Sequence, residues 1–199
     1  MVLYNGRPDV MRFLRGPDVI EDRMLIWKVK KGDRSAMQRI YEKYKDDLLR
    51  IAAGLLTEPS AAEDVVHDVF AAFIQSLDRF SLTGSLRGFL TVCVANRARN
   101  LNRSQARHPQ ATLDSRVPPA GRQERPDQWI VMDETLRQFC LAMEQLPYEQ
   151  REVVILRVQG EMKFSTIAAL QQTSVKTVLS RYRYGISKLR SLLNGEVSQ

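Results

Sequence analysis

The residues of this sequence best suited to catalysis are carboxylates, and none of them stands in a catalytic motif. Asp46 with Asp47 and Asp64 with Asp68 form pairs suited to acid–base chemistry, but no nucleophile or metal ligand accompanies them at a fixed spacing. The chain contains no HExxH, no P-loop, no GxGxxG after a predicted strand, no GxSxG and no kinase signature. We therefore expect a protein that binds and positions other molecules, and not an enzyme.

The histidines and cysteines do not indicate a metal site either. His67, His108, Cys93 and Cys140 are scattered, and no CxxC or other ligand spacing joins them. We expect no metal and no cofactor. The sequence also shows no disulfide framework, no signal peptide and no apolar run near the ~20 residues that cross a bilayer. These features favour a cytoplasmic protein without membrane insertion.

Positive charge is concentrated in two separate segments. Residues 79–113 contain six arginines and no acid, and residues 162–195 contain six basic residues and no acid. Segment 114–161 between them carries nine acidic and six basic side chains. Basic surfaces of this kind attract the phosphates of nucleic acids and release counterions. Each segment could instead be a solvated helix face, an alternative that charge alone leaves open.

The second basic segment ends in a helix with two different faces. One face is a predicted buried stripe of Val175, Val178, Tyr182, Ile186, Leu189 and Leu193. The other face carries hydrogen-bond donors: Lys176, Thr177, Ser180, Arg181, Arg183, Tyr184 and Lys188. A shorter helix at about 164–171 and a turn precede it, and Ser174 is placed to cap it. This pattern predicts a helix-turn-helix whose second helix reads a major groove. Arg181 could instead form a salt bridge within its own domain.

Helical periodicity covers most of the remaining chain. We predict helices at 19–31, ended by Gly32, at 33–58 with Asp33 as cap, at 60–77 with Ser60 as cap, and from Ser85 to about Arg107. The third of these carries an apolar stripe that we interpret as core: Val65, Val66, Val69, Phe70, Phe73, Ile74 and Leu77. Trp27, Trp129, Cys93 and Cys140 are interpreted as packing residues.

The composition changes between residues 104 and 127, where four prolines occur and apolar residues are few. We interpret 1–18 as a flexible extension, 19–103 as a first domain, 104–127 as a flexible linker and 128–199 as a second domain. In the second domain Pro147 is predicted to start a helix that Gly160 ends. The predicted fold class is all-α, with two small helical domains joined by a linker.

The first domain resembles domain 2 of bacterial RNA polymerase sigma factors of the extracytoplasmic-function (ECF) type. Residues 62–70, AEDVVHDVF, are similar to the most recognisable motif of that family, and Gly32-Asp33, Met37, Ile40-Tyr41 and Tyr44 resemble the residues that precede it. In the family this helix binds the clamp helices of the largest polymerase subunit. The resemblance implies polymerase contacts for Asp64, His67 and Asp68, with His67 at a position where glutamine is more common.

Residues 85–103 resemble the promoter-melting helix of the family, which captures bases of the minus-ten element on the non-template strand. The resemblance implies that four residues contact this DNA: Asn96, Arg97, Asn100 and Arg103. Phe89 stands where the family usually has tryptophan, and Asn100 stands where it usually has aspartate. We therefore expect a base preference that differs from the common one.

The second domain resembles domain 4 of these sigma factors, which binds the minus-thirty-five element and the polymerase flap. Leu146-Pro147, residues 151–154 (REVV), Ile167-Ala168 and residues 188–190 (KLR) fall at the family's spacing. The resemblance implies minus-thirty-five contacts for Lys176, Thr177, Ser180, Arg181, Arg183, Tyr184 and Lys188. Gln172 replaces a common glycine in the turn, so we expect a left-handed residue there at some cost in strain.

The hypothesis that covers the whole chain is a sigma factor that binds core RNA polymerase and promoter DNA, both as duplex and as opened strand. The resemblance also implies an anti-sigma factor as a partner. Two alternatives remain. A helix-turn-helix regulator that dimerises on a palindrome leaves the motif at 62–70 and the first basic segment unexplained. A sigma-like adaptor without polymerase-directing activity would fit the departures at Phe89 and Gln172.

Overall fold

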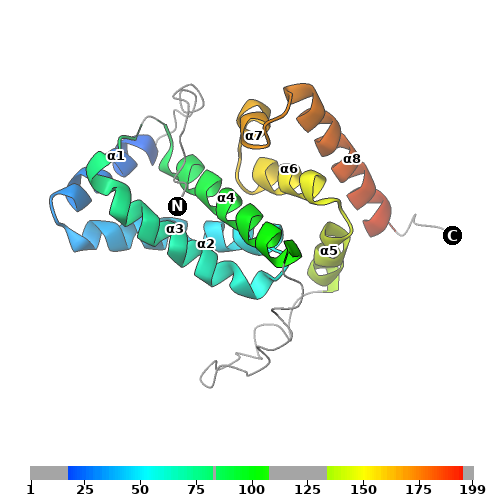
Figure 1. The fold of residues 1–199 in the computed structure, drawn as a ribbon, viewed down its shortest axis with the longest axis horizontal. Coiled ribbons are helices and arrows are strands. Elements are labelled where there is room, and N and C mark those ends of the chain that lie inside the picture. Colours follow the sequence, from blue (N-terminus) through cyan, green and yellow to red (C-terminus); the bar gives the residue numbers. More distant parts are fainter. Residues whose placement is uncertain (1–17, 83, 108–133, 195–199) are drawn as a thin grey trace, which may run out of the picture.

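The structure is a computed structural model that describes residues 18–82, 84–107 and 134–194. Every regular element in this part of the chain is helical (Figure 1), which confirms the predicted all-α class. The proposed extension, apart from Asp18, lies outside the described residues, as do 108–127 of the proposed linker and Trp129. None of the described helices is both long and apolar enough to span a membrane.

The amino-terminal bundle consists of α1 (Asp18–Lys30), α2 (Arg34–Leu55), α3 (Ala62–Ser76) and α4 (Leu86–Arg107), with short 3-10 turns at Pro59–Ala61 and Leu77–Arg79. The carboxyl-terminal bundle consists of α5 (Glu134–Glu144), α6 (Tyr148–Val158), α7 (Phe164–Leu170) and α8 (Val175–Leu193). Residues 104–107, which we assigned to the linker by composition, belong to the last turn of α4.

Local capping explains where several helices begin. Asp33 accepts from the backbone N–H groups of Ser35 and Ala36, and Ser174 accepts from Thr177, as predicted. Gly32 turns the chain between α1 and α2 with a φ of +89°. The start of α3 differs, because Pro59 begins a 3-10 turn and Ala61 becomes the N-cap residue one position after Ser60.

The end of α6 also differs from the prediction, since the left-handed residue there is Glu161, with a φ of +52°, and not Gly160. A Cβ at Gly160 would lie 2.7 Å from the carbonyl oxygen of Leu156. Glycine is therefore needed at this position for the close backbone approach that ends the helix.

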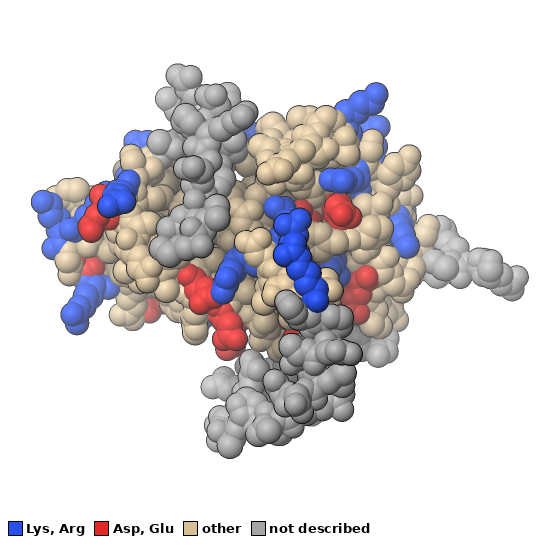
Figure 2. Space-filling model, viewed as in Figure 1, with Lys and Arg blue, Asp and Glu red and all other residues tan. Residues whose placement is uncertain are grey.

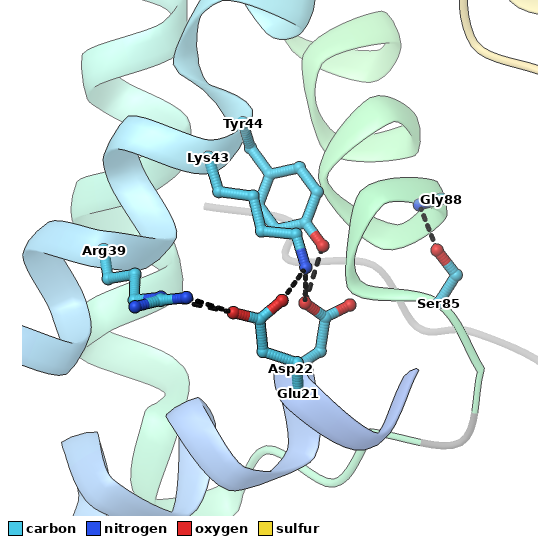
Figure 3. A network of polar contacts seen from close by, with 7 residues as sticks. All are labelled: Glu21, Asp22, Arg39, Lys43, Tyr44, Ser85 and Gly88. Atoms are coloured by element: carbon cyan, nitrogen blue, oxygen red, sulfur yellow. Dashed lines mark hydrogen bonds and ion pairs between the residues drawn. The ribbon is translucent and has the colours of Figure 1, made fainter. Parts of the chain in front are cut away.

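A polar network joins α1 to α2 (Figure 3). Asp22 is fully buried and accepts hydrogen bonds from the Tyr44 hydroxyl at 2.6 Å and from the Lys43 ammonium at 3.1 Å. Glu21 accepts from Lys43 at 2.9 Å and from the exposed Arg39 at 2.9 Å. Burial and the hydrogen bond to Asp22 raise the pKa of the Tyr44 hydroxyl above its ordinary value, so it remains a donor.

We expect Tyr44→Phe to lower the free energy of unfolding by about 1–3 kcal/mol, because the buried Asp22 carboxylate loses its shortest donor. Urea unfolding followed by circular dichroism measures this change. Arg39→Ala removes an exposed ion pair of the same network and should cost less than about 1 kcal/mol. Equal decreases in the free energy of unfolding for the two variants would contradict the central role of the buried hydrogen bond.

The core of the first bundle is built from the inward faces of α2, α3 and α4, with Ile40, Leu48, Leu55, Val65 and Leu90 among its most buried residues. The stripe predicted on α3 is buried except at one position. Ile74 is 48% exposed, because this helix is covered on only one side. The prediction that Trp27 packs in the core is wrong as well, since its side chain is 60% exposed on α1.

Two residues of α4 extend this core at its edge. Phe89 packs against Phe73 and Phe80, with ring centroids 6.1 and 4.8 Å apart respectively. Cys93 is half-buried, and burial raises the pKa of its thiol to about 12. The thiol is therefore protonated at neutral pH, as expected of a packing residue.

In the second bundle α8 packs on α6 and α7. Gly185 allows the closest approach, since a Cβ there would lie 3.0 Å from Cγ2 of Val154. The stripe predicted on α8 is only partly buried. Val178 and Leu189 lie in the core, whereas Val175 and Leu193, at the two ends of the helix, are 42% and 41% exposed because the bundle does not extend that far.

The turn between α7 and α8 contains the left-handed residue expected at position 172, with a φ of +53°. We expect Gln172→Gly to raise the free energy of unfolding by about 0.5–1 kcal/mol, because glycine adopts this conformation without a Cβ clash. Thermal unfolding tests this increase. Gln75→Gly, at an exposed helical position of α3, should have the opposite effect by about 1 kcal/mol.

The two bundles are also in direct contact, which the sequence did not predict. Helix α6 packs against α2, and the two bundles lie side by side in Figure 1. A Cβ at Gly54 of α2 would lie 2.7 Å from Cδ1 of Ile155 of α6, so the absence of a side chain at Gly54 makes room for Ile155. Helices α2 and α6 therefore meet in a close contact between the two bundles.

Candidate nucleic-acid interface

The exposed face of α3 carries the three residues that the resemblance assigns to polymerase binding. Asp64, His67 and Asp68 are all exposed, on the side of the helix opposite its buried stripe. Nε2 of His67 lies 3.1 Å from the hydroxyl of Tyr41 on α2, which holds the imidazole against the bundle. The structure thus places the three side chains together on one open, polar helix face.

The adjoining part of α4 carries the residues assigned to minus-ten DNA. Arg97, Asn100 and Arg103 are exposed, whereas Asn96 is half-buried. Arg97 forms an ion pair with Asp68 at 2.5 Å, so the α3 face and the α4 face share a contact. Asn96 accepts at 3.4 Å from Arg99, a residue whose guanidinium is directed towards the second bundle.

The exposed face of α8 carries most of the residues assigned to minus-thirty-five DNA. Lys176, Ser180, Arg183, Lys188 and Tyr184 are exposed, and the Tyr184 side chain is 68% accessible. Figure 2 shows lysine and arginine side chains along this helix and over the carboxyl-terminal end of α4. A helix surface rich in donors, with an aromatic residue among them, can contact both phosphates and base edges.

Two residues of the same set have partners inside the domain. Thr177 and Ser174 place their hydroxyl oxygens 2.9 Å apart at the start of α8. Arg181 donates to the side-chain oxygen of Gln171 at 2.7 Å. Arg181 is therefore engaged within its own domain, by a hydrogen bond to an amide where the alternative considered was a salt bridge.

Sequence reasoning did not single out Glu152, a buried residue of α6 that contacts Arg99 of α4 across the two bundles. Its carboxylate is 1% exposed and accepts from Arg99 at 2.6 Å, Gln171 at 2.7 Å and Tyr148 at 3.2 Å. Burial and the charge of Glu152 raise the pKa of the Tyr148 hydroxyl, which therefore remains a donor. The sequence did contain a signal for this residue, because Glu152 directly precedes the apolar run Val153–Leu156. A carboxylate in such a position requires hydrogen-bond partners.

Two family models match the chain, in the order expected from the geometry. The model of Sigma-70 region 2 matches residues 40–108, which include α3 and α4, and that of Sigma-70 region 4 matches 136–189, which include the helix-turn-helix. Relatives include the ECF RNA polymerase sigma factor SigW of Bacillus subtilis, which is 26% identical over 84% of this chain and 94% of that protein. This chain is an ECF sigma factor.

Other relatives of this sigma factor carry similar names. The ECF RNA polymerase sigma-E factor of Escherichia coli is 25% identical, and the RNA polymerase sigma-H factor of Pseudomonas aeruginosa is 24% identical. In both cases the match covers 81% of the sigma factor described here and 88% of the relative.

Two solved structures share the fold of this sigma factor. One is CnrH in complex with the cytosolic domain of CnrY, with a TM-score of 0.61, 23% identity, and coverage of 87% of this chain and 97% of that one. The other is RpoE of Bartonella quintana in complex with the anti-sigma factor NepR, with a TM-score of 0.62, 22% identity, and coverage of 81% and 98%.

Proposed function

We propose that this sigma factor binds core RNA polymerase through α3 and directs promoter-specific initiation by contacting the minus-ten element through α4 and the minus-thirty-five element through α8. The observation that carries this proposal is the presence in one chain of three exposed polar helix faces, each in the region where its family model matches. The proposed domains are 19–103 and 128–199, joined by 104–127, with 1–18 as an extension.

The α3 face suits a protein partner because it is acidic, helical and open. Asp64 and Asp68 lie one turn apart, with His67 beside them, on a helix whose opposite side is fully packed. Such a rigid face can align carboxylates with basic side chains of a partner helix, which gives specificity and a fast association rate. We assign the clamp helices of the largest polymerase subunit as that partner by the family resemblance.

The α4 face suits an opened DNA strand. Arg97 and Arg103 can neutralise phosphates, while the amides of Asn96 and Asn100 can pair with the edges of unstacked bases. Phe89 is packed with Phe73 and Phe80, at the position where the family usually has tryptophan. We infer that base capture relies on polar contacts more than on stacking at this position.

The α8 face suits duplex DNA because a donor-rich helix that follows a tight turn fits the major groove. Arg183 and Tyr184 lie in the middle of the face, with Lys176 and Lys188 towards its two ends. We assign the central pair to base contacts and the lysines to phosphate contacts. The positive end of the helix dipole at Ser174 adds to the attraction for phosphate.

In this mechanism the sigma factor contributes recognition and strand capture, and the polymerase contributes the chemistry. We propose no catalytic residue in this chain and place its action in the cytoplasm, where RNA polymerase works. We also propose an anti-sigma factor as a partner, supported by the two structural neighbours, whose titles describe CnrH bound to CnrY and RpoE bound to NepR.

The adaptor alternative relied partly on the altered turn at Gln172. In the structure that residue adopts the left-handed conformation, and the backbone N–H of the next residue, Thr173, bonds the carbonyl of Ala168 at 2.9 Å. The turn therefore presents α8 in spite of the substitution, which favours DNA reading over loss of it.

The proposed function is tested by transcription in vitro with purified core RNA polymerase and a pool of genomic promoter fragments. We expect transcripts that start at defined sites only when the sigma factor is added, with an asymmetric footprint upstream that requires polymerase. A symmetric footprint from the protein alone would support the palindrome-binding regulator. Polymerase binding without any promoter-specific transcript would support the adaptor.

A further inference from the structure

Helix α1 carries a row of apolar side chains that point away from the bundle. Ile20, Met24 and Trp27 follow one another at helical spacing, and their side chains are 77%, 51% and 60% exposed. The opposite side of the same helix is also apolar, because Leu25 and Ile26 pack into the core of the first bundle. The fold therefore explains the inward set of apolar residues on α1 but not the outward one.

Basic side chains border this exposed apolar stripe. At about 100° per residue, Arg23 and Lys30 lie on one side of it and Lys28 on the other, while Lys31 follows its carboxyl-terminal end. All four are exposed. Lys30 donates to the carbonyl of Phe80 at 2.7 Å. The other three form no ion pair within the part of the chain that the structure describes.

The acidic residues next to this surface are engaged elsewhere. Glu21 and Asp22 both accept from Lys43 of α2. Asp33, whose carboxyl interacts with Lys28, is half-buried and caps α2. The outer face of α1, which we define as residues 20, 23, 24, 27, 28 and 31, therefore presents an apolar centre with a positively charged border.

A face that is both apolar and basic can bind nucleic acid, protein or lipid. Single-stranded nucleic acid uses basic side chains together with aromatic stacking, but Ile20 and Met24 offer no flat ring on which a base can stack. Lysine is depleted at protein interfaces relative to the rest of the surface. In contrast, basic residues beside tryptophan and aliphatic side chains are typical of helices that lie at a bilayer surface, where anionic headgroups attract the positive charges.

We propose that the outer face of α1 binds the surface of anionic phospholipid membranes. Ile20, Met24 and Trp27 enter the boundary between headgroups and acyl chains, and the basic border contacts lipid phosphates. The helix then lies in the plane of the bilayer surface and does not span it. Helix α1 lies on the side of the first bundle away from α5 to α8 (Figure 1), and the residues assigned to polymerase and promoter belong to α3, α4 and α8. Bound lipid therefore leaves those residues unoccupied.

Vesicle binding by the full chain tests this proposal. In the Trp129→Phe variant Trp27 is the only tryptophan, because the chain has two. Its emission should shift to shorter wavelength when vesicles of equal parts phosphatidylcholine and phosphatidylglycerol are added, since the indole leaves water. Co-sedimentation with the vesicles gives the partition coefficient. Vesicles of phosphatidylcholine alone should bind the protein at least about tenfold more weakly, because they carry no net charge.

Two triple variants show whether this binding belongs to α1. Arg23→Gln/Lys28→Gln/Lys31→Gln should lower the partition coefficient on anionic vesicles about 100-fold, because each basic side chain at a charged surface contributes about fivefold. The control removes the same charge from three exposed positions on α4, α8 and the segment before α7, and should bind as the wild type does: Arg107→Gln/Lys163→Gln/Arg190→Gln. Equal loss in both variants would mean that net charge alone attracts the protein, and would overturn the proposal.

A further variant tests the apolar stripe separately. Ile20→Ser/Met24→Ser keeps every charge on α1 and should weaken binding to anionic vesicles at least about tenfold, because two apolar side chains no longer leave water. Both positions are exposed, so circular dichroism should report an unchanged fold. Wild-type binding by this variant would show that the stripe does not enter the bilayer, which would also overturn the proposal.

Other occupants of this face would give different results, and each would overturn the proposal. A shift in Trp27 emission that grows with protein concentration in the absence of lipid would assign the stripe to a second copy of the chain. Quenching of Trp27 by a short single strand, without any response to vesicles, would assign it to nucleic acid. A response to vesicles only after removal of residues 1–17 would assign it to the chain itself. The assay contains neither polymerase nor promoter, so its outcome is independent of the proposed function.

Discussion

Replacing Asp64 and Asp68 together with arginine is expected to abolish binding to core RNA polymerase, with a loss of at least about a hundredfold in affinity. Both carboxylates are exposed on one face of α3, one turn apart, so their replacement leaves the buried stripe of the helix intact. Charge reversal places two positive charges opposite a partner surface that is expected to be basic. Juxtaposed like charges at an interface cost several kcal/mol. Pull-down of core polymerase with immobilised sigma factor measures the loss.

Two matched variants separate this effect from side effects of the change. Asp68 forms an ion pair with Arg97, so Arg97→Ala removes the pair without reversing the charge on α3 and should retain polymerase binding. Asp78→Arg reverses an exposed charge in the turn after α3 and should also bind normally. Wild-type binding by the double variant, or equal loss in Arg97→Ala, would contradict the assignment of the α3 face.

Arg183→Ala is expected to weaken binding to the minus-thirty-five duplex by about 10- to 100-fold and to relax the preference at one base pair. Arg183 is exposed in the middle of α8, where a guanidinium can donate two hydrogen bonds to one guanine. Such a bidentate contact contributes about 1–3 kcal/mol of discrimination. The measurement is competition binding between the mapped promoter duplex and its single-base variants.

Lys188→Ala provides the contrast for this prediction. Lys188 lies nearer the end of α8 and is expected to contact phosphate. Its loss should therefore weaken binding to all duplexes equally, and should reduce the slope of log affinity against log salt concentration by about 1. Base-dependent effects of Lys188→Ala, or uniform effects of Arg183→Ala, would reverse the two assignments. Thermal unfolding should be unchanged for both, because both side chains are exposed.

The helices and their order were predictable because the signals are local. These signals are the capping residues Asp33 and Ser174 and apolar stripes such as Val65 to Phe73. Each of them acts within a few residues of the chain, and the structure contains them all. The exceptions lie where burial depends on distant neighbours. Trp27 and Ile74 are apolar and helically spaced but exposed, because nothing in the described residues covers those faces of α1 and α3.

The fold class, the two basic helical regions and the three polar helix faces could all be predicted from residue order, because helical spacing and charge sign follow directly from it. Which arginine side chains are exposed depends instead on how the helices pack. Arg103 is exposed, whereas Arg99 pairs with a glutamate 53 residues away. Likewise, the close fit of Gly54 and Ile155 depends on how the surfaces of α2 and α6 pack against each other. Contacts between residues distant in sequence depend on docking geometry, and no local pattern within either segment encodes them.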